Sequence, residues 1–117
     1  MAVLITGGTG YIGSHTVVEM LNNDYEVIIV DNLSNSKIDV LDKIYEITGK
    51  KVKFYQYDLC DEALVDRIFN ENKIDAVIHF AGLKAVGEST MKPIEYYYNN
   101  ILSTLNLIKV MKKNDVK

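Results

Sequence analysis

Apolar runs and amphipathic stretches alternate along the whole chain. Four short segments are expected strands because they are apolar and rich in β-branched or aromatic residues, and the third of them alternates apolar with polar positions. They are Val3–Ile5, Val27–Val30, Val52–Tyr57 and Ala76–Phe80. Each is followed by a segment with the three- and four-residue spacing of a helix. A strand–helix unit repeated four times predicts a parallel sheet with helices on both faces.

The apolar positions of the helical segments predict which faces are buried. Asp61 is suited to cap the third helix, and Pro93 suits the first turn of the last one. The expected core positions are Ile12, Val17, Met20 and Leu21, then Ile38 or Val40 with Leu41, Ile44 and Ile47, then Leu64, Val65, Ile68 and Phe69, and finally Ile94, Tyr98, Ile101, Leu105 and Ile108.

Glycines cluster where the first expected strand meets the first expected helix. The segment from Thr6 to Gly13 reads Thr-Gly-Gly-Thr-Gly-Tyr-Ile-Gly, and its motif glycines are either Gly8, Gly10 and Gly13 or Gly7, Gly10 and Gly13. Such a turn lets the backbone approach a pyrophosphate, while the N–H groups at the start of the helix meet its charge. The alternative is a glycine-rich turn without a ligand, which the strand–turn–helix context disfavours.

An aspartate follows this motif at the spacing of a dinucleotide site. Asp31 ends the second expected strand, about 20 residues beyond the glycines. A carboxylate beside the glycine turn can accept hydrogen bonds from both hydroxyls of an adenosine ribose and would repel a 2′-phosphate, which favours NAD over NADP. The alternative is a loop aspartate on the surface.

Together with right-handed connections, the strand–helix alternation and the dinucleotide motif predict an incomplete, Rossmann-type, doubly wound sheet of about four strands in the order 3-2-1-4.

Composition excludes several classes of protein. The 117 residues are 48% hydrophobic and 25% charged, which is ordinary for a globular unit. No linker composition divides 1–117, so we expect one part of one domain. The net charge of −3 gives no support for nucleic-acid binding. No apolar run approaches the roughly 20 residues of a membrane helix, and no secretory signal is recognisable. The lone Cys60 suits the reducing cytoplasm.

The remaining reactive side chains have ordinary structural interpretations. His15 opens the first helix and could touch a phosphate, although packing or solvent exposure is the more common role. His79 lies in the fourth strand, where we expect a hydrogen-bonded core residue. Neither histidine has a second ligand at a usable spacing, so we expect no metal site. Cys60 has no identifiable base beside it and is not expected to be a nucleophile.

Four segments together resemble one enzyme family. They read GGTGYIGSH from Gly7, DNLSNS from Asp31, IHFAGLKAVGES from Ile78, and YYYN from Tyr96 to Asn99. Over essentially the whole chain they resemble the UDP-glucose 4-epimerase family of extended short-chain dehydrogenases/reductases, and the segment from Ile78 is the most specific. The resemblance implies NAD as cofactor and a UDP-sugar as substrate. It also implies hydride transfer from C4 of the sugar and back to its other face through a 4-keto intermediate.

The resemblance also implies roles for particular residues. Asp58 and Leu59 would bracket the adenine, and Lys84 would place positive charge near the cofactor. The implied cofactor contacts are Gly7, Gly10, Tyr11, Ile12, Gly13, Asp31, Asn32, Leu33, Asn35, Ser36, Asp58, Leu59, Phe80, Ala81, Gly82, Lys84 and Asn99. Lys84, Ala85 and Val86 would border the sugar.

The family's catalytic pair has no counterpart in this sequence. It would appear as Tyr-x-x-x-Lys after a fifth strand, and that pattern occurs nowhere in 1–117. We therefore expect no catalytic residue here, an inactive isolated chain that binds NAD weakly if at all, and an exposed fourth-strand edge that promotes self-association or a homodimer. The alternatives are another extended short-chain sugar-nucleotide enzyme, such as a dehydratase or uronate epimerase, and an NAD-binding module without catalysis.

Overall fold

Strands and helices alternate through the parts of the chain that the computed structural model describes, which are residues 2–33, 39–81 and 93–116, apart from the side chains of residues 93, 96 and 97. The elements are β1 (Ala2–Thr6), α1 (Tyr11–Asn22), β2 (Glu26–Val30), α2 (Asp39–Thr48), β3 (Lys53–Tyr55), α3 (Glu62–Glu71), β4 (Ala76–His79) and α5 (Pro93–Lys113). The predicted alternation is confirmed, with β3 and β4 shorter than the sequence pattern indicates.

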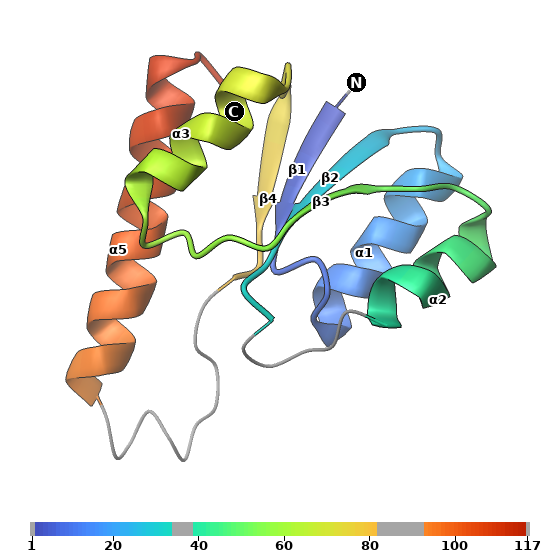
Figure 1. The fold of residues 1–117 in the computed structure, drawn as a ribbon, viewed down its shortest axis with the longest axis horizontal. Helices are drawn as coiled ribbons and strands as arrows, with labels where there is room; N and C mark the ends of the chain where they lie inside the picture. Colours follow the sequence, from blue (N-terminus) through green and yellow to red (C-terminus); the bar gives the residue numbers. More distant parts are fainter. Residues whose placement is uncertain (1, 34–38, 82–92, 117) are drawn as a thin grey trace.

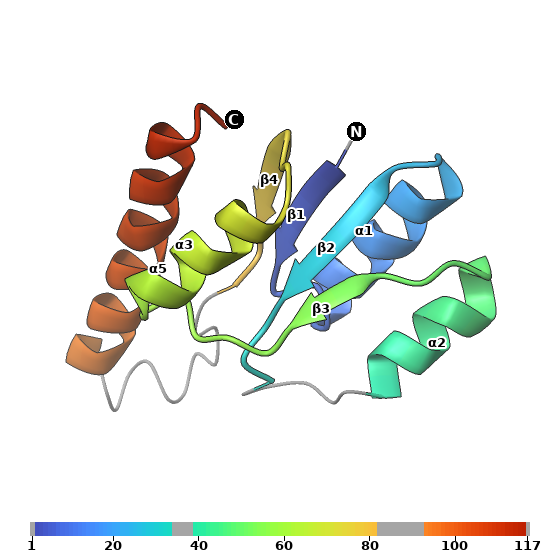
Figure 2. The ribbon, with the colours of Figure 1, turned by 45° about the horizontal axis from the view of Figure 1, so that its top comes forward.

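The four strands form one parallel sheet in the order β3-β2-β1-β4 (Figure 2). Helices α1 and α2 cover one face of the sheet, and α3 and α5 cover the other (Figure 1). This is the predicted incomplete Rossmann-type arrangement. Every strand runs in the same direction, so all four carboxyl ends lie along one edge of the sheet.

The core has two layers, one on each face of β1 and β2. Successive strand residues point to opposite faces, so Leu4 packs toward α3 and α5, while Ile5 packs toward α1 and α2. Asp61 caps α3 as predicted, because its side chain accepts a 3.1 Å hydrogen bond from the backbone N–H of Ala63. The expected core residues Val65, Ile68 and Phe69 of α3 are buried.

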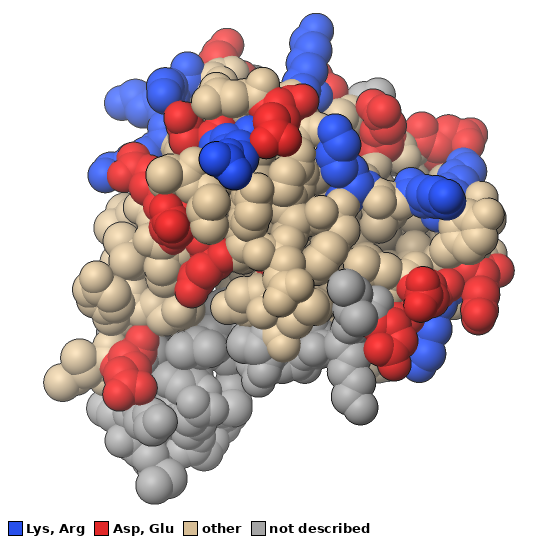
Figure 3. Space-filling model, in the orientation of Figure 1, with Lys and Arg blue, Asp and Glu red and all other residues tan. Residues whose placement is uncertain are grey.

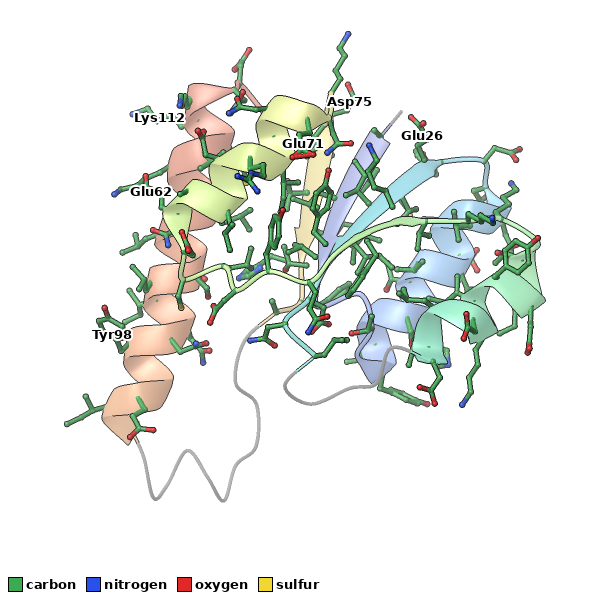
Figure 4. The ribbon with its side chains drawn as sticks, in the orientation of Figure 1. Glu26, Glu62, Glu71, Asp75, Tyr98 and Lys112 are labelled. Atoms are coloured by element: carbon green, nitrogen blue, oxygen red, sulfur yellow. The ribbon has the colours of Figure 1, made fainter. Side chains whose placement is uncertain are left out.

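Helix α5 corrects the predicted core. The five residues of its predicted stripe are all exposed, from 51% to 80%: Ile94, Tyr98, Ile101, Leu105 and Ile108. Figure 4 shows Tyr98 directed away from the sheet. The buried residues of α5 are Ser103, Asn106, Leu107 and Val110. The helix has two apolar faces, and α3 packs on only one of them. The other face lies outside the edge strand β4, where no described residue covers it.

Two isoleucines expected in the core are also exposed. Ile12, at 60%, lies in the first turn of α1, which extends beyond the ends of the strands in Figure 1. Ile47, at 67%, lies near the end of α2, and this helix packs chiefly against α1, so that it buries only a narrow stripe around Ile44. A helix that touches one neighbour buries fewer residues than its periodicity predicts.

Candidate functional site: the carboxyl edge of the sheet

Three chain segments leave the sheet side by side at its carboxyl edge. They are the glycine turn after β1, residues 31–33 after β2, and Phe80–Ala81 after β4. Backbone hydrogen bonds join them: the N–H of Gly7 donates to the carbonyl of Val30 at 2.9 Å, and the N–H of Phe80 donates to the carbonyl of Thr6 at 3.0 Å. Ligands of open α/β sheets bind along this edge, and the predicted site residues that belong to these described segments lie there.

The glycines of the turn have different reasons for lacking a side chain. Gly7 has a φ of 69°, and a Cβ there would lie 2.8 Å from the backbone nitrogen of Ala81. A Cβ on Gly13 would lie 2.1 Å from the carbonyl oxygen of Gly7. Gly10 has an ordinary φ of −73°, and its Cβ would approach nothing in the described chain closer than 3.4 Å. Internal packing therefore explains Gly7 and Gly13 but not Gly10.

Gly10 is the N-cap residue of α1, and its position leaves the helix terminus uncapped. Glycine has no side chain that could accept a hydrogen bond from the N–H groups of the first turn, and the first turn of α1 contains no acidic residue. The first helical hydrogen bond runs from the N–H of Ser14 to the carbonyl of Gly10 at 2.8 Å. Helix geometry thus leaves the N–H groups of Tyr11, Ile12 and Gly13 without helical acceptors. Such a terminus carries partial positive charge and attracts an anion.

The carboxylate of Asp31 is turned toward the glycine turn, as the sequence predicts. Its Oδ2 accepts hydrogen bonds from the hydroxyl of Thr9 at 2.5 Å and from the N–H of Thr9 at 3.3 Å. Its Oδ1 accepts from the N–H of Leu33 at 2.9 Å. Leu33 has a φ of 61°, a left-handed conformation that is unusual for a branched side chain. Strained backbone of this kind is typical of ligand sites.

A chain of hydrogen bonds runs from the end of β4 to α5. The N–H of Ala81 donates to Oγ1 of Thr6 at 3.1 Å, and that oxygen lies 2.5 Å from Nδ1 of His79. Nε2 of His79 lies 3.1 Å from Oγ1 of Thr104, whose hydroxyl donates to the carbonyl of Asn100 at 2.8 Å. If the Thr104 hydroxyl donates to Asn100, its oxygen accepts from Nε2 of His79. The expected hydrogen bonding of His79 is confirmed, but its expected burial is wrong because β4 is an edge strand.

The loop after β3 is tied to α5. Asp58 accepts a 2.9 Å hydrogen bond from the N–H of Cys60, and the carbonyl of Leu59 accepts one of 2.9 Å from the buried side chain of Asn106. The side chain of Leu59 is itself buried in the core. The amide of Asn99 lies 3.5 Å from Sγ of Cys60. Burial, with a smaller effect from Asp58, raises the pKa of the Cys60 thiol to about 11, which makes it a poor nucleophile.

The structure does not place every predicted site residue. Six of them lie outside the described residues: Asn35, Ser36, Gly82, Lys84, Ala85 and Val86. His15 has a local role, because its Nδ1 lies 2.7 Å from the carbonyl of Tyr11 and its ring lies 4.7 Å from the Tyr11 ring. Sequence reasoning missed Thr9 as the partner of Asp31, although a hydroxyl between two motif glycines is a visible signal.

The opposite edge of the sheet carries paired charges. An open hollow of about 740 Å³ there is lined by residues that include Asp24, Glu26 and Lys50. The ammonium of Lys50 lies 2.6 Å from Asp24 and 2.7 Å from the carbonyl of Leu21, and it lowers the pKa of Asp24. Figure 3 shows acidic and basic side chains interspersed along this part of the surface. The hollow therefore offers no concentration of one charge.

Neither a metal centre nor a membrane span is present in the described ranges. They contain no group of three or more histidine, cysteine or acidic side chains arranged to hold a metal ion. Within the same ranges, the helices are too short or too polar to cross a membrane.

Comparison with known proteins gives consistent matches. The sequence profile of the family described as GDP-mannose 4,6 dehydratase matches residues 4–117. Two curated relatives named UDP-glucose 4-epimerase are 57% identical over 117 residues, from Bacillus subtilis, and 60% identical over 116 residues, from Haemophilus influenzae. They match 100% and 99% of this chain, which spans only 34% of the length of each.

Solved structures agree with the sequence matches. The UDP-glucose 4-epimerase of Bifidobacterium longum, crystallised with NAD+ and UDP, is 61% identical with a TM-score of 0.97, and the match covers 100% of this chain and 35% of that one. The enzyme of Thermus thermophilus, crystallised with NAD, is 36% identical with a TM-score of 0.89, again covering 100% of this chain and 35% of the other.

Proposed function

The chain belongs to the family described as GDP-mannose 4,6 dehydratase, and from this premise we propose that it is the NAD-binding portion of a UDP-glucose 4-epimerase. The complete enzyme would interconvert UDP-galactose and UDP-glucose in galactose metabolism. The relatives with the whole-chain matches support the epimerase activity over the dehydratase activity in the family's description. Within the chain, the segment from Ile78 to Ser89 resembles the epimerases more than the dehydratases.

The observation that carries the cofactor proposal is the position of the Asp31 carboxylate beside an uncapped helix terminus. The N–H groups of Tyr11, Ile12 and Gly13 would hold the pyrophosphate. The space beside Gly10 would admit it. Asp31 would accept from the ribose hydroxyls. These groups provide what a dinucleotide needs, namely donors for its phosphates and an acceptor for its adenosine ribose.

The other predicted contacts extend the proposed site along the same edge. Asn32 and Leu33 would follow Asp31 around the ribose, and Asp58 and Leu59 would bracket the adenine. Phe80 and Ala81 would line the path of the cofactor, and Asn99 would contact it from α5. The proposal also includes the predicted residues outside the described ranges, with Lys84, Ala85 and Val86 beside the sugar. When bound, NAD supplies a hydride acceptor that can return the hydride to C4 of the sugar.

The chain's own residues would bind and orient the cofactor without moving a proton. The sequence contains no Tyr-x-x-x-Lys pattern, and Cys60 is a poor nucleophile. We therefore assign the acid–base step to polypeptide outside this sequence, and we expect the isolated chain to be inactive. The lone thiol fits a reducing compartment, which supports a cytoplasmic location.

The proposal also includes self-association of the isolated chain. One side of β4 pairs with β1, and its other side is the edge of the described sheet. The exposed stripe of α5 lies outside this edge strand. An unpaired strand edge together with an apolar helix face recruits a second chain.

The test compares the full-length gene product with the isolated 117-residue chain. Supplied with UDP-galactose, the full-length product should form UDP-glucose and contain NAD, while the isolated chain should form none. Asp31→Asn in the full-length product should lower NAD content and activity together. Loss of water from the sugar would instead identify a dehydratase. NAD binding without any sugar turnover would identify a non-catalytic module.

A further inference from the structure

Thr9 connects the two halves of the proposed dinucleotide site. It lies between Gly8 and Gly10, and its side chain is almost fully buried, with 2% of the residue exposed. Its hydroxyl lies 2.5 Å from Oδ2 of Asp31, and its backbone N–H lies 3.3 Å from the same oxygen. Thr9 belongs to the turn after β1 and Asp31 to the end of β2. The contact therefore links the segment that would hold phosphate to the carboxylate that would hold ribose.

The geometry fixes the orientation of the Asp31 carboxylate before any ligand arrives. An ionised carboxylate only accepts hydrogen bonds, so the hydroxyl of Thr9 must be the donor. Hydrogen bonds to a charged acceptor are short and about twice as strong as neutral ones. The other oxygen, Oδ1, accepts from the N–H of Leu33 at 2.9 Å. Both oxygens are thus held from the protein side: Oδ2 accepts two hydrogen bonds from Thr9, and Oδ1 accepts one from Leu33, which leaves Oδ1 a lone pair that can face outward.

We propose that Thr9 is a positioning residue that sets the preference for NAD over NADP by holding the carboxylate of Asp31 toward the ribose. This inference rests on the proposed NAD site. A negative charge excludes a 2′-phosphate only while it stays beside the 2′ position. Without the hydroxyl of Thr9, only the backbone N–H groups of Thr9 and Leu33 hold the carboxylate, so it can turn away from the 2′ position more easily. The ribose is then bound less well, and a 2′-phosphate meets less repulsion.

Conservative variants of Thr9 separate this role from a packing role. Thr9→Val keeps the branched shape but removes the donor, and Thr9→Ser keeps the donor but removes a methyl group. Thr9→Ala lacks the donor without adding bulk, in case valine does not fit. A purely structural residue would change the melting temperature and leave the ratio of the two dinucleotide affinities unchanged. The affinity ratio is therefore the informative measurement.

The experiment removes bound NAD from the full-length gene product and then titrates NAD and NADP into it by calorimetry. We expect the ratio of affinities to fall about tenfold in Thr9→Val and Thr9→Ala, the effect of losing one hydrogen bond to a charged group. Thr9→Ser should stay near wild type. Because Thr9 acts through Asp31, Thr9→Val should change the ratio little further in an Asp31→Asn background.

Each failure has a distinct meaning. A wild-type protein that binds neither dinucleotide overturns the proposed function and this inference with it. Wild-type binding of NAD with an unchanged ratio in Thr9→Val and Thr9→Ala overturns the inference alone. The inference alone is also overturned if Thr9→Val shifts the affinity ratio equally in the wild-type and Asp31→Asn backgrounds.

Discussion

At the scale of single residues, Gly10 and Gly13 belong to one turn, but the surrounding atoms leave space for a Cβ only at Gly10. A Cβ on Gly13 would lie 2.1 Å from the carbonyl oxygen of Gly7, whereas a Cβ on Gly10 would lie 3.4 Å from the same atom. The first distance requires the backbone to move, and the second is an ordinary contact. Stability and ligand binding should therefore respond differently to alanine at the two positions.

We predict that Gly13→Ala destabilises the protein by about 1–3 kcal/mol or more, as overpacking does. Gly10→Ala should cost less than about 1 kcal/mol, since alanine is only a poorer N-cap than glycine. Yet Gly10→Ala should strongly weaken NAD binding, because its methyl group occupies the space beside the helix terminus. Thermal unfolding and NAD titration of both variants check this. Wild-type NAD affinity in Gly10→Ala would contradict the placement of the pyrophosphate.

The thiol of Cys60 gives a second prediction at this scale. Burial and the neighbouring Asp58 raise its pKa from 9.0 to about 11. At pH 8 its thiolate fraction is then about 100-fold lower than that of an unshifted thiol, so alkylation of the folded protein should be slower by about this factor. The raised pKa favours the folded state below pH 9, and this contribution is lost as the pH rises through about 11.

Iodoacetamide labelling of native and urea-unfolded protein at pH 8 measures the difference. Cys60→Ser provides the blank, because Cys60 is the only cysteine in the sequence. Equal labelling rates in the native and unfolded states would show that the thiol is not shielded.

At the scale of elements, α5 has a buried side that includes both polar and apolar residues, and an apolar exposed side. Asn106 is 3% exposed, and its side chain donates to the carbonyl of Leu59 at 2.9 Å. Leu105, the preceding residue, is 51% exposed. The helix is therefore positioned by a hydrogen bond to the loop after β3 as well as by apolar packing against α3.

We predict the effects on stability of an apolar side chain at Asn106 and a polar side chain at Leu105. Hydrophobicity alone would suggest that the first stabilises and the second destabilises, and we expect neither. Asn106→Leu should destabilise the 117-residue chain by about 1–3 kcal/mol, because the carbonyl of Leu59 loses its donor in a buried place. Leu105→Asn should stay within about 1 kcal/mol, as surface substitutions generally do. Urea unfolding at low protein concentration compares them. A larger loss in Leu105→Asn would mean that the exposed side of α5 is the buried one.

The same helix shows how far the sequence predicts the fold. Element order, sheet order, the capping by Asp61 and the position of Asp31 all follow from local patterns, and the structure confirms them. The inward face of α5 does not follow, because Ile101 and Leu107 both belong to apolar stripes and periodicity cannot rank two stripes on one helix. The choice depends on which elements are available to pack, and that is not a local property.

In the candidate site, too, some residues can be predicted from local sequence and others only from the folded chain. The glycines and Asp31 are recognisable because their spacing along the chain is fixed by one strand–turn–helix unit. The contact of Thr9 with Asp31 and that of His79 with Thr104 join segments that are distant in sequence. The first contact needs the strand order that places β1 beside β2, and the second needs α5 to pack beside β4. Pair geometry of this kind is visible only in the folded chain.

At the scale of the whole molecule, the apolar face of α5 is not covered by any other described residue. One edge strand of the sheet, β3, lies nearest α2, whereas α5, which carries the exposed stripe, lies outside the other edge strand, β4 (Figure 2). Burying apolar area contributes roughly 25 cal/mol per Å², so a face with five large apolar residues favours association. The isolated chain can cover this face with a second copy of itself.

We predict that the weight-average mass of the isolated chain rises with concentration in sedimentation equilibrium. The double substitution Ile101→Gln and Ile108→Gln should move the chain toward the monomer, because it makes the centre of the stripe polar. Ile47→Gln is the matched control, since Ile47 is 67% exposed but lies on α2, on the other face of the sheet. A mass that stays monomeric at all concentrations would contradict self-association. An equal effect of Ile47→Gln would show that general surface hydrophobicity, and not the face of α5, holds the copies together.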